Sequence, residues 1–485
     1  MLASLLLAKE WDNTIQDIEI TGIAYDSRQV LPGYAFVCIT GFETDGHKYV
    51  DAAVKNGAAL IVAENKVDTQ APVCYVNDTR KTLADMSCAF YENPSKSFKL
   101  IGVTGTNGKT TVTYLVKSIL AQAGAEVGII GTNQNIIGDK VLLTKSNTPT
   151  TPNSLELQKI FAEMRDGGAE YVVMEVSSHA LELSRVRGCE FDVGVFTNLT
   201  RDHLDFHKTM KNYMLAKAKL FDHSAFGAIN IDDEYGKQIQ ELRSGDKIIT
   251  YGIEKPCDVL AKDIKITPRG VNFTVEYKGS DYPMFLCIPG TFSVYNALSA
   301  ICAALLLGID METISRGLGS AMGVLGRVEV VPTDTDYTVI IDYAHTPDGL
   351  ENIIRAMKSV SKGKVITLFG CGGDRDNTKR APMGEIAGKL SDFSVITSDN
   401  PRTEDPLKII EMIEEGIKGT NGEYVVIPDR REAIHYVLDN AKADDVIILA
   451  GKGQETYQII GKEKYDFDER VVVFSHLNNN RESDK

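Results

Sequence analysis

The sequence predicts an α/β protein of three domains, with a parallel sheet in the central domain and a second, smaller sheet in the last. Two observations support this. Apolar strand-like runs alternate with amphipathic helical runs through most of the chain, as in parallel sheets covered by helices on both faces. The length of 485 residues also suits about three domains. We place the domains at residues 1–98, 99–330 and 331–485.

The first domain is predicted from short apolar strands and a helical patch before a turn. The strands are GIAYDSR, YAFVCIT, ALIVAE and VCYV, and the helical patch is KYVDAAVKNGA. Asn93, Pro94 and Ser95 then form a turn and linker signal. Before these strands, MLASLLLAKEW at residues 1–11 predicts an amphipathic helix, because no basic region precedes its short apolar run.

The central domain opens with the strand KLIGVTG, a glycine-rich loop and the helix TTVTYLVKSILAQAG. Apolar residues in this helix recur at three- and four-residue spacing, and a glycine follows its end. Strands at VGIIG, YVVMEVS and DVGVFTNL continue the alternation, and residues 255–289 predict β-hairpins inserted before the helix SVYNALSAICAALLLG. The last domain alternates again, at VITLFG, FSVITSD, EYVVIPD and DVIILAG, which predicts a second, Rossmann-like doubly wound sheet.

Composition excludes several classes of protein. The formal net charge is −15, so general binding to nucleic acid or to an anionic membrane surface is not expected. No stretch approaches the roughly 20 apolar residues of a membrane span. The eight cysteines are scattered, without a Cys-x-x-Cys pair, which indicates reduced thiols rather than a disulfide framework. We therefore expect a cytoplasmic protein without membrane insertion.

The strongest motif is VTGTNGKTT at residues 103–111, between a strand and a helix. Backbone N–H groups from Gly105 to Gly108 can cradle phosphate oxygens, Lys109 can supply a positive charge and Thr110 a hydroxyl for Mg²⁺. The strict P-loop pattern requires a glycine where this chain has Val103. The physical ingredients are nevertheless present in a shorter loop, so we predict a P-loop-type nucleotide site.

Acidic and histidine side chains follow two neighbouring strands. Glu175 ends the apolar run YVVME, and FTNLTRDHLDFH brings Asp202, His203, Asp205 and His207 after the next strand. Ligands of parallel sheets lie at the carboxyl ends of the strands. We therefore expect metal or phosphate chemistry at this edge, although ordinary exposed carboxylates and a solvated turn are the alternatives.

Lys217 lies in NYMLAKAKLF, where Tyr213, Lys217 and Phe221 share one helical face. Taken alone, a lysine whose stem lies along aromatic rings while its ammonium reaches water is the better interpretation of this pattern.

Three strand-end loops in the last third combine arginine with carboxylates. They are FGCGGDRDNTKR, TSDNPRTEDP and LAGKGQETY, and VIIDYAHTPDG precedes them with Asp342 and His345. Arginine for a carboxylate and aspartate or glutamate for an ammonium are the groups that would bind a zwitterion. Loops that merely carry charge are the alternative.

Ten motifs in this order resemble those of the Mur ligases. They are GTNGKTT, EVSSHAL, NLTRDHLDFH, the Tyr-x-x-x-Lys-x-x-x-Phe helix, VYNALSA, LGRVE, DYAHTPD, GCGGDRD, DNPR and AGKGQE. The segment AYDSRQVLPGYAFVCITGFETDGHKYVDAA is similar to the uridine-nucleotide-binding region of the same family. The resemblance thus spans nearly the whole chain. It implies an ATP-dependent ligase of cytoplasmic peptidoglycan precursor synthesis, which we expect to be a monomer.

The resemblance also implies roles for individual residues. For catalysis it implies Lys109, Glu175, His203 and Lys217, and Lys217 is the lysine that the family carries as an N6-carboxylate formed from CO₂, which reverses the interpretation from the helix alone. For Mg²⁺ it implies Thr110, Glu175, His203 and carboxylated Lys217. For ATP it implies Gly105, Thr106, Asn107, Gly108, Lys109, Thr110, Thr111, Asn296, Arg327 and Asp342. For UDP-N-acetylmuramoyl-L-Ala-D-Glu it implies Ser27, Thr150, Thr151, Ser177 and Arg185, and for diaminopimelate Arg375, Asp399, Asn400, Pro401, Arg402, Gly451 and Glu455.

The DNPR run decides the amino-acid substrate in this family. Its arginine accompanies meso-diaminopimelate, whose distal carboxylate needs a cationic partner, whereas a buried arginine would repel the ε-ammonium of lysine. The expected reaction joins meso-diaminopimelate to the γ-carboxylate of the D-Glu unit through an acyl phosphate. Three alternatives remain: the same ligase acting on L-lysine, a folylpolyglutamate synthetase, and a catalytically silent nucleotide-binding regulator. The regulator is disfavoured because Lys109, Glu175 and Lys217 are all present.

Overall fold

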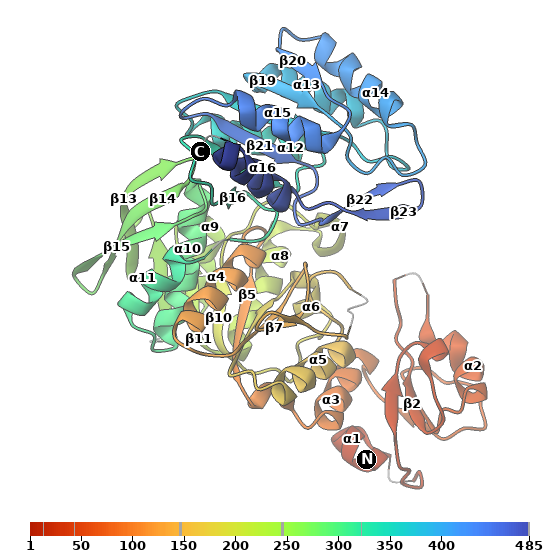
Figure 1. Cartoon of the computed structure of the whole chain (residues 1–485). Coiled ribbons are helices and arrows are strands. Elements are labelled where there is room, and N and C mark those ends of the chain that lie inside the picture. Colours follow the sequence, from red (N-terminus) through yellow and green to blue (C-terminus); the bar gives the residue numbers. More distant parts are fainter. Residues whose placement is uncertain (13, 43, 145–147, 244–246, 322, 484–485) are drawn as a thin grey trace. The chain divides into compact units, whose positions relative to one another are not determined.

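The computed structural model describes residues 1–12, 14–42, 44–144, 148–243, 247–321 and 323–483 (Figure 1). The chain forms two compact units. The first comprises Met1–Leu260, Glu276–Ser280 and Tyr295–Gly317, and the second Ala261–Val275, Asp281–Val294 and Leu318–Lys485. The predicted α/β class with parallel sheets is confirmed, and the three-domain boundaries stay a prediction.

The N-terminal part of the first unit is a four-stranded parallel sheet in the order β1-β2-β3-β4. Alternate strand residues face opposite sides, because side chains along a strand alternate. Val37 and Val62 pack with α1 and α3, whereas Phe36 and Ile61 pack with α2. The elements are β1 (Gly22–Ala24), β2 (Tyr34–Val37), β3 (Leu60–Ala63), β4 (Val73–Tyr75), α1 (Ala3–Leu7), α2 (Val50–Lys55) and α3 (Thr79–Phe90).

The central sheet of the first unit runs in the order β12-β11-β10-β5-β9-β6-β7-β8. It is parallel from β12 to β6, and β7 and β8 add an antiparallel edge. Its strands are β5 (Lys99–Thr104), β6 (Val127–Ile130), β7 (Ile136–Ile137), β8 (Lys140–Val141), β9 (Tyr171–Glu175), β10 (Phe191–Phe196), β11 (Ser224–Asn230) and β12 (Ile248–Gly252). Its order places β10 and β9 on either side of β5, so the loops after these three strands share one edge of the sheet.

Helices cover the central sheet through apolar faces. Leu157 and Phe161 of α5 pack on Leu100 and Met174 of the sheet, and residues of α8 and α9 pack around Phe196. The helices are α4 (Lys109–Gln122), α5 (Ser154–Asp166), α6 (Ser178–Glu182), α7 (Leu204–His207), α8 (Met210–Ala218), α9 (Glu234–Leu242), α10 (Thr291–Leu306) and α11 (Met311–Gly319). The predicted hairpins are confirmed as β13 (Val259–Thr267), β14 (Gly270–Tyr277) and β15 (Ser280–Leu286).

The second unit contains a doubly wound sheet in the order β16-β17-β21-β18-β19-β20, antiparallel only at β16. Neighbouring residues Val339 and Ile340 of β17 point into different cores. One core holds α12 (Pro347–Lys358), α13 (Arg380–Leu390) and α14 (Pro406–Lys418), and the other α15 (Arg430–Asn440) and α16 (Glu469–Ser483). The strands are β16 (Glu329–Val331), β17 (Thr338–Asp342), β18 (Val365–Phe369), β19 (Phe393–Ile396), β20 (Tyr424–Val426), β21 (Val446–Ala450) and the hairpin β22 (Tyr457–Ile460) and β23 (Glu463–Asp466).

Two general predictions can be compared with the structure. The eight cysteines carry free thiols, and six of them are buried while Cys257 and Cys287 are half-buried. No described helix is long and apolar enough to cross a lipid bilayer.

Candidate functional site

The loop after β5 has the backbone of a phosphate-binding loop. Gly105 and Gly108 have φ angles of 154° and 86°, a region that favours glycine because it lacks Cβ. A Cβ built on Gly108 would stand 2.3 Å from Asn296 Oδ1, and one on Gly105 would stand 1.9 Å from Thr197 Oγ1. Gly108 directly precedes α4, so the free N–H groups of that helix open onto the loop. The predicted residue Asn296 therefore lies against the phosphate loop.

Two lysines bind the same carbonyl of this loop. Lys109 Nζ donates hydrogen bonds to Gly105 O at 3.0 Å and Thr106 O at 2.9 Å, and Lys217 Nζ donates to Gly105 O at 2.7 Å. Burial lowers the pKa of Lys109, although Glu175 and Asp202 oppose the shift. Burial and the neighbouring charge of Lys109 lower the pKa of Lys217 far below its usual value. Loss of the proton is thus made easier at both ammonium groups.

The environment of Lys217 differs from the one expected from its helix alone. Its side chain is 1% exposed, and its Nζ lies 4.7 Å from the centre of the Tyr213 ring. The α-helix ends at Ala218, so Phe221 lies in the following 3₁₀ turn, Lys219–His223, rather than in the same α-helix. The lysine is enclosed because it points back under the phosphate loop, which helical spacing alone does not reveal.

Glu175 is a buried carboxylate at the end of β9, 1% exposed. Its Oε1 accepts hydrogen bonds from Thr110 Oγ1 and Thr132 N, both at 2.9 Å, and its Oε2 accepts one from Thr132 Oγ1 at 3.1 Å. Thr110 and Glu175 thus present oxygen atoms side by side, and oxygen ligands are those that Mg²⁺ prefers. The predicted residues Thr110 and Glu175 lie together.

The segment after β10 does not bring its four potential ligands together as one metal site. These are Asp202, His203, Asp205 and His207. His203 is exposed and lies 3.4 Å from Asp202, whereas His207 is buried and hydrogen-bonded to Ser178 Oγ at 2.8 Å. Burial, with His179 nearby, lowers the pKa of His207 to about 4. Among the residues described, no three His, Cys, Asp or Glu side chains gather as a metal site. His203 as a single ligand stays a prediction.

Four residues predicted for the muramoyl dipeptide meet beside Glu175. Thr151 Oγ1 donates to the Glu175 carbonyl at 2.9 Å and accepts from Ser177 N at 3.0 Å, and Arg185 Nη1 donates to Thr151 O at 3.1 Å. Thr150, with φ at 66°, contacts Thr132 Oγ1 at 3.0 Å through its own hydroxyl. Among the described residues, the buried Nε of Arg185 has no hydrogen-bond partner.

Ser27 lies in a separate cavity of about 530 Å³ in the N-terminal part, lined also by Tyr25, Arg28 and Tyr49. Tyr25 also lines a small cleft of about 40 Å³ that contains Arg185, and its hydroxyl donates to Glu156 at 2.6 Å. Tyr25 therefore borders both the Ser27 cavity and the Arg185 cleft. The sequence prediction missed this residue.

In the second unit, Asp342 holds the turn that carries Arg327. The two oxygens of Asp342 accept from Val328 N at 2.7 Å and from Ala344 N at 2.8 Å. Val328 has φ at 47°, so a β-branched residue is kept in a strained conformation. Burial raises the pKa of Asp342, although both hydrogen bonds oppose the shift. The predicted pair Arg327 and Asp342 thus belongs to one structural element, with exposed Arg327 displayed beside the strained residue.

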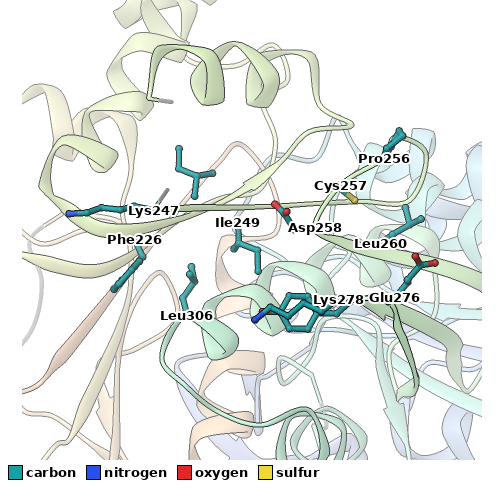
Figure 2. A pocket seen from close by; sticks show the side chains of 13 residues that line it. Phe226, Lys247, Ile249, Pro256, Cys257, Asp258, Leu260, Glu276, Lys278 and Leu306 are labelled. Carbon is teal, nitrogen blue, oxygen red and sulfur yellow. The ribbon is translucent and has the colours of Figure 1, made fainter. Parts of the chain in front are cut away.

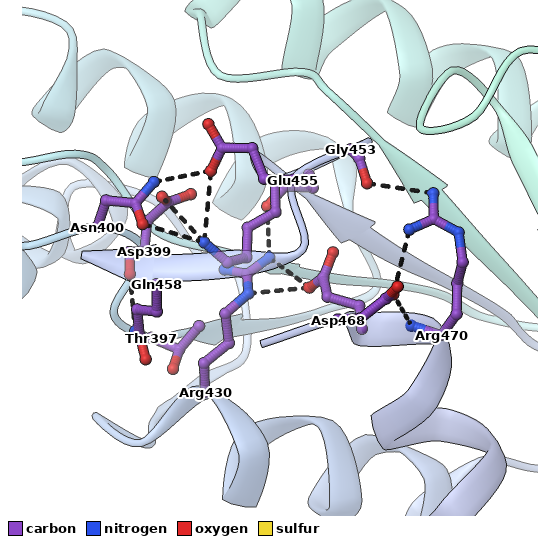
Figure 3. A network of polar contacts seen from close by, with 12 residues as sticks. Thr397, Asp399, Asn400, Arg430, Gly453, Glu455, Gln458, Asp468 and Arg470 are labelled. Atoms are coloured by element: carbon purple, nitrogen blue, oxygen red, sulfur yellow. Dashed lines mark hydrogen bonds and ion pairs between the residues drawn. The ribbon is translucent and has the colours of Figure 1, made fainter. Parts of the chain in front are cut away.

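Four residues predicted for diaminopimelate meet at the carboxyl ends of β19 and β21: Asp399, Asn400, Gly451 and Glu455. Asp399, Asn400 and Glu455 lie together in Figure 3, and Asn400 Nδ2 donates to Glu455 Oε2 at 2.8 Å. A Cβ on Gly451, whose φ is 112°, would stand 2.7 Å from Asp399 Oδ2. Arg402 also has positive φ, at 50°.

Contacts with backbone groups fix the DNPR loop, whereas Arg375 lies outside the buried cluster. Arg402 N donates to Ile459 O at 3.1 Å, and Arg402 Nη1 donates to Gly373 O at 2.7 Å. Pro401 O lies 2.0 Å from where a Cβ of Gly373 would stand, so the two glycine-rich loops touch. Arg375 is exposed and bonded only locally, to Asp374 O at 3.1 Å. The structure therefore does not bring Arg375 into the buried cluster.

Three further residues hold this machinery and received no role from the sequence. Asn198 Oδ1 accepts from Asn107 N at 2.9 Å, Thr132 holds both oxygens of Glu175, and Lys452 is fully buried beside Asp399. Asn198 and Lys452 belong to the motifs NLTRDHLDFH and AGKGQE, and Lys452 was already one of the charged residues of its strand-end loop. Thr132 carried no signal beyond following an apolar strand.

A larger cavity, of about 650 Å³, lies at the amino ends of β11 and β12 (Figure 2). Phe226, Ile249 and Leu306 contribute apolar side chains, and Lys247 and Lys278 contribute cations. None of the predicted site residues line it. It therefore lies at the edge of the sheet away from the phosphate loop.

A glycine loop, a lysine and a buried glutamate at one strand edge define a nucleotide-dependent α/β enzyme. The chain matches the Mur ligase middle domain over residues 103–304, the Mur ligase glutamate ligase domain over residues 326–453, and the Mur ligase family catalytic domain over residues 19–91. The chain belongs to the Mur ligase family, and it is an ATP-dependent ligase that forms amide bonds.

The names of similar proteins state the substrates of those proteins. The chain is 52% identical to a UDP-N-acetylmuramoyl-L-alanyl-D-glutamate–2,6-diaminopimelate ligase of Caldanaerobacter subterraneus subsp. tengcongensis, and the match covers 94% of each chain. It is 50% identical to such a ligase of Clostridium acetobutylicum, again over 94% of each. A solved structure of a ligase with the same name matches 99% of this chain and 100% of its own, with 30% identity and a TM-score of 0.78.

Proposed function

We propose that this Mur ligase joins meso-diaminopimelate to the γ-carboxylate of D-Glu in UDP-N-acetylmuramoyl-L-Ala-D-Glu and converts ATP to ADP and phosphate. The observation that carries the proposal is the DNPR loop. Arg402 lies three residues after buried Asp399, so a cation for the distal carboxylate and an anion for an ammonium share one short loop. Relatives with about half of their residues identical to this chain carry the corresponding name.

The phosphate loop would act on ATP. The γ-carboxylate of the substrate attacks the γ-phosphorus, the bond to the β,γ-bridging oxygen breaks, and an acyl phosphate and ADP form. Lys109 lies within 3 Å of two carbonyls of the loop, where its charge can neutralise the transferring phosphoryl oxygens. Asn296 packs against Gly108 and would contact the nucleotide. We assign Arg327 and Asp342, of the second unit, to the nucleotide as well.

Thr110 and Glu175 would hold Mg²⁺, with His203 as a third ligand. They fit this ion because the Thr110 hydroxyl and the buried Glu175 carboxylate stand 2.9 Å apart and offer hard oxygen donors. When bound, the ion supplies positive charge next to the phosphates. The three hydrogen bonds described for the Glu175 side chain all come from uncharged threonine groups.

Lys217 would carry a carboxylate on Nζ. A neutral amine attacks the carbon of CO₂, and the loss of one proton gives an anionic carbamate. Burial favours the neutral amine at Lys217, and the cation Lys109 bound to the same carbonyl would pair with the new anion. The modification would turn a second ammonium under the phosphate loop into an oxygen ligand.

The dipeptide and the amino acid would bind on separate groups. Thr150, Thr151, Ser177 and Arg185 lie beside Glu175, where the dipeptide end would meet the phosphate loop, and the Ser27 cavity would take the uridine diphosphate end. The amine of meso-diaminopimelate then attacks the acyl phosphate carbonyl, the carbon–oxygen bond to phosphate breaks, and the amide forms with loss of a proton.

ADP release tests the proposal directly. The assay contains UDP-N-acetylmuramoyl-L-Ala-D-Glu, Mg²⁺, ATP and either meso-diaminopimelate or L-lysine, with the product mass determined in each case. We expect turnover with meso-diaminopimelate and little with lysine. Faster turnover with lysine would retain the ligase but reject the role of Arg402, and silence with both would favour a nucleotide-binding regulator.

A further inference from the structure

Lys452 is a fully buried ammonium among residues assigned to the amino acid. Its side chain is 0% exposed, and its Nζ lies 3.5 Å from Glu455 Oε2 and 3.9 Å from Asp399 Oδ1. It also donates a hydrogen bond to Asn400 Oδ1 at 3.2 Å. Lys452 therefore contacts three side chains that would bind the substrate: Asp399, Asn400 and Glu455. Figure 3 shows Asp399, Asn400 and Glu455 converging.

The surroundings of Lys452 leave it no route to the substrate. The rings of Tyr457 and Phe467 lie 6.0 and 5.9 Å from its Nζ. Since water does not reach the side chain, a bound ligand cannot touch it without rearrangement of these residues. Lys452 must act through its neighbours.

The same neighbours are also fixed by two contacts from β22, one from its backbone and one from a side chain. Ile459 N donates to Asn400 Oδ1 at 2.9 Å, and Gln458 Nε2 donates to Asp399 O at 2.7 Å. Asn400 Oδ1 is thus shared between Ile459 N and Lys452 Nζ, so its amide nitrogen is directed at Glu455. Lys452 and the Ile459 N–H thus both favour this orientation of the amide.

Charge explains why the buried group is a cation. Asp399 and Glu455 are two carboxylates in one loop cluster, and without Lys452 their like charges would repel each other. With Lys452 the cluster keeps one net negative charge, which matches one substrate ammonium. The cluster is therefore balanced to accept a single positive group.

We propose that Lys452 is a positioning residue for the amino-acid substrate: it orients Asp399, Asn400 and Glu455 for the ammonium of meso-diaminopimelate. The inference rests on the proposed function and extends it, because it assigns substrate selection to a side chain that does not contact substrate. A larger KM for the amino acid alone is the expected signature of its loss.

Lys452→Met tests this, with Lys464→Met as the matched control. Lys464 is an exposed lysine of the same hairpin, with its Nζ 3.6 Å from the Tyr457 ring. For Lys452→Met we expect the KM for meso-diaminopimelate to rise about ten- to a hundredfold, the loss typical of a charged hydrogen bond. The KM values for ATP and the UDP-dipeptide should stay within about twofold. Lys464→Met should match the wild type in all three.

The conservative variant Lys452→Arg separates positioning from a structural role. The groups that face Lys452 are Asp399, Glu455, Arg430 and Glu469. Arginine keeps a cation among these groups, so Lys452→Arg should return the KM for meso-diaminopimelate toward the wild-type value.

The outcomes are distinguishable. Wild-type enzyme that shows no turnover with meso-diaminopimelate rejects the proposed function itself. Wild-type turnover with an unchanged KM in Lys452→Met overturns the positioning role alone. Equal losses for all three substrates, or a KM for meso-diaminopimelate that Lys452→Arg does not restore, indicate a structural role and also overturn it. If Lys452→Met does not fold, the double variant with Glu455→Gln must fold better and resemble Glu455→Gln alone for the positioning role to stand.

Discussion

Replacement of Arg430 should destabilise the second unit strongly and in a pH-dependent way. Arg430 and Glu469 form a buried ion pair, with side chains 0% and 1% exposed and an Nη2–Oε1 distance of 2.8 Å. Arg430 Nε donates to the same oxygen at 2.9 Å, and Nη2 also donates to Ala450 O at 2.9 Å. The pair thus links α15, α16 and the end of β21 (Figure 3).

The magnitude follows from the burial of Glu469. Removing one partner of a buried pair costs about 3–5 kcal/mol, because the other charge is left without a partner in a poorly polarisable surrounding. Among the described residues, Glu469 Oε2 already lacks a hydrogen-bond partner, so Arg430→Met removes the described hydrogen bonds of the carboxylate and leaves Lys452 as the nearby cation. We expect a loss near the upper end of that range at pH 8.

Protonation of Glu469 should then reduce the loss. Burial already raises the pKa of Glu469 in the wild type, and Arg430 opposes that shift. In Arg430→Met the folded-state pKa rises further above the unfolded value, so the folded state binds the proton more tightly. Stability relative to the wild type therefore increases as the pH falls from 8 to 6, by at most about 1.4 kcal/mol per pH unit.

Urea unfolding at pH 6 and pH 8 measures this deficit, and hydrogen exchange of α15 and α16 assigns the transition to the second unit. The double variant Arg430→Met with Glu469→Leu should recover most of the loss, since no unpaired charge remains. A deficit that is below about 1 kcal/mol, or equal at both pH values, would refute the reasoning.

Three further outcomes can be measured. Gly108→Ala should raise the KM for ATP about five- to thirtyfold, because alanine is strained by about 1–2 kcal/mol at φ 86° and its Cβ would meet Asn296. The control Gly124→Ala, where φ is similar and the space around the Cβ is open, should leave the KM for ATP unchanged. Arg402→Met should lower kcat/KM for meso-diaminopimelate about ten- to a hundredfold, and an undiminished preference over lysine would contradict the assignment. Protein equilibrated with ¹³C-bicarbonate should show one carbamate NMR signal that Lys217→Ala lacks, and a signal retained in that variant would exclude this lysine.

The sequence was sufficient to predict the α/β class because the relevant signals are local. Strand–loop–helix patterns such as 99–124 place a glycine loop at a strand end whatever the rest of the chain does. The hairpins at 255–289 were predicted for the same reason, and β13, β14 and β15 confirm them.

The functional site was harder to predict from the sequence because its geometry depends on contacts between segments that are distant in the chain. From its helix alone, Lys217 was interpreted as a lysine whose ammonium reaches water. Its hydrogen-bond partner, the carbonyl of Gly105, lies 112 residues away in the sequence. Thr132 and Glu175 likewise meet only because β6 and β9 are neighbours in the sheet. Lys452 could not be assigned because a lysine in a glycine-rich loop gives no indication that it will be buried.

The hydrogen bonds that Lys109 and Lys217 make to the phosphate loop have a consequence for anion selectivity. Three N–H···O contacts to backbone carbonyls satisfy these two side chains. An incoming anion must replace neutral acceptors rather than find an exposed charge. Chloride or a single phosphate offers few new contacts for that exchange, whereas a triphosphate also engages the helix N-terminus. The loop should therefore favour a nucleoside triphosphate over small inorganic anions.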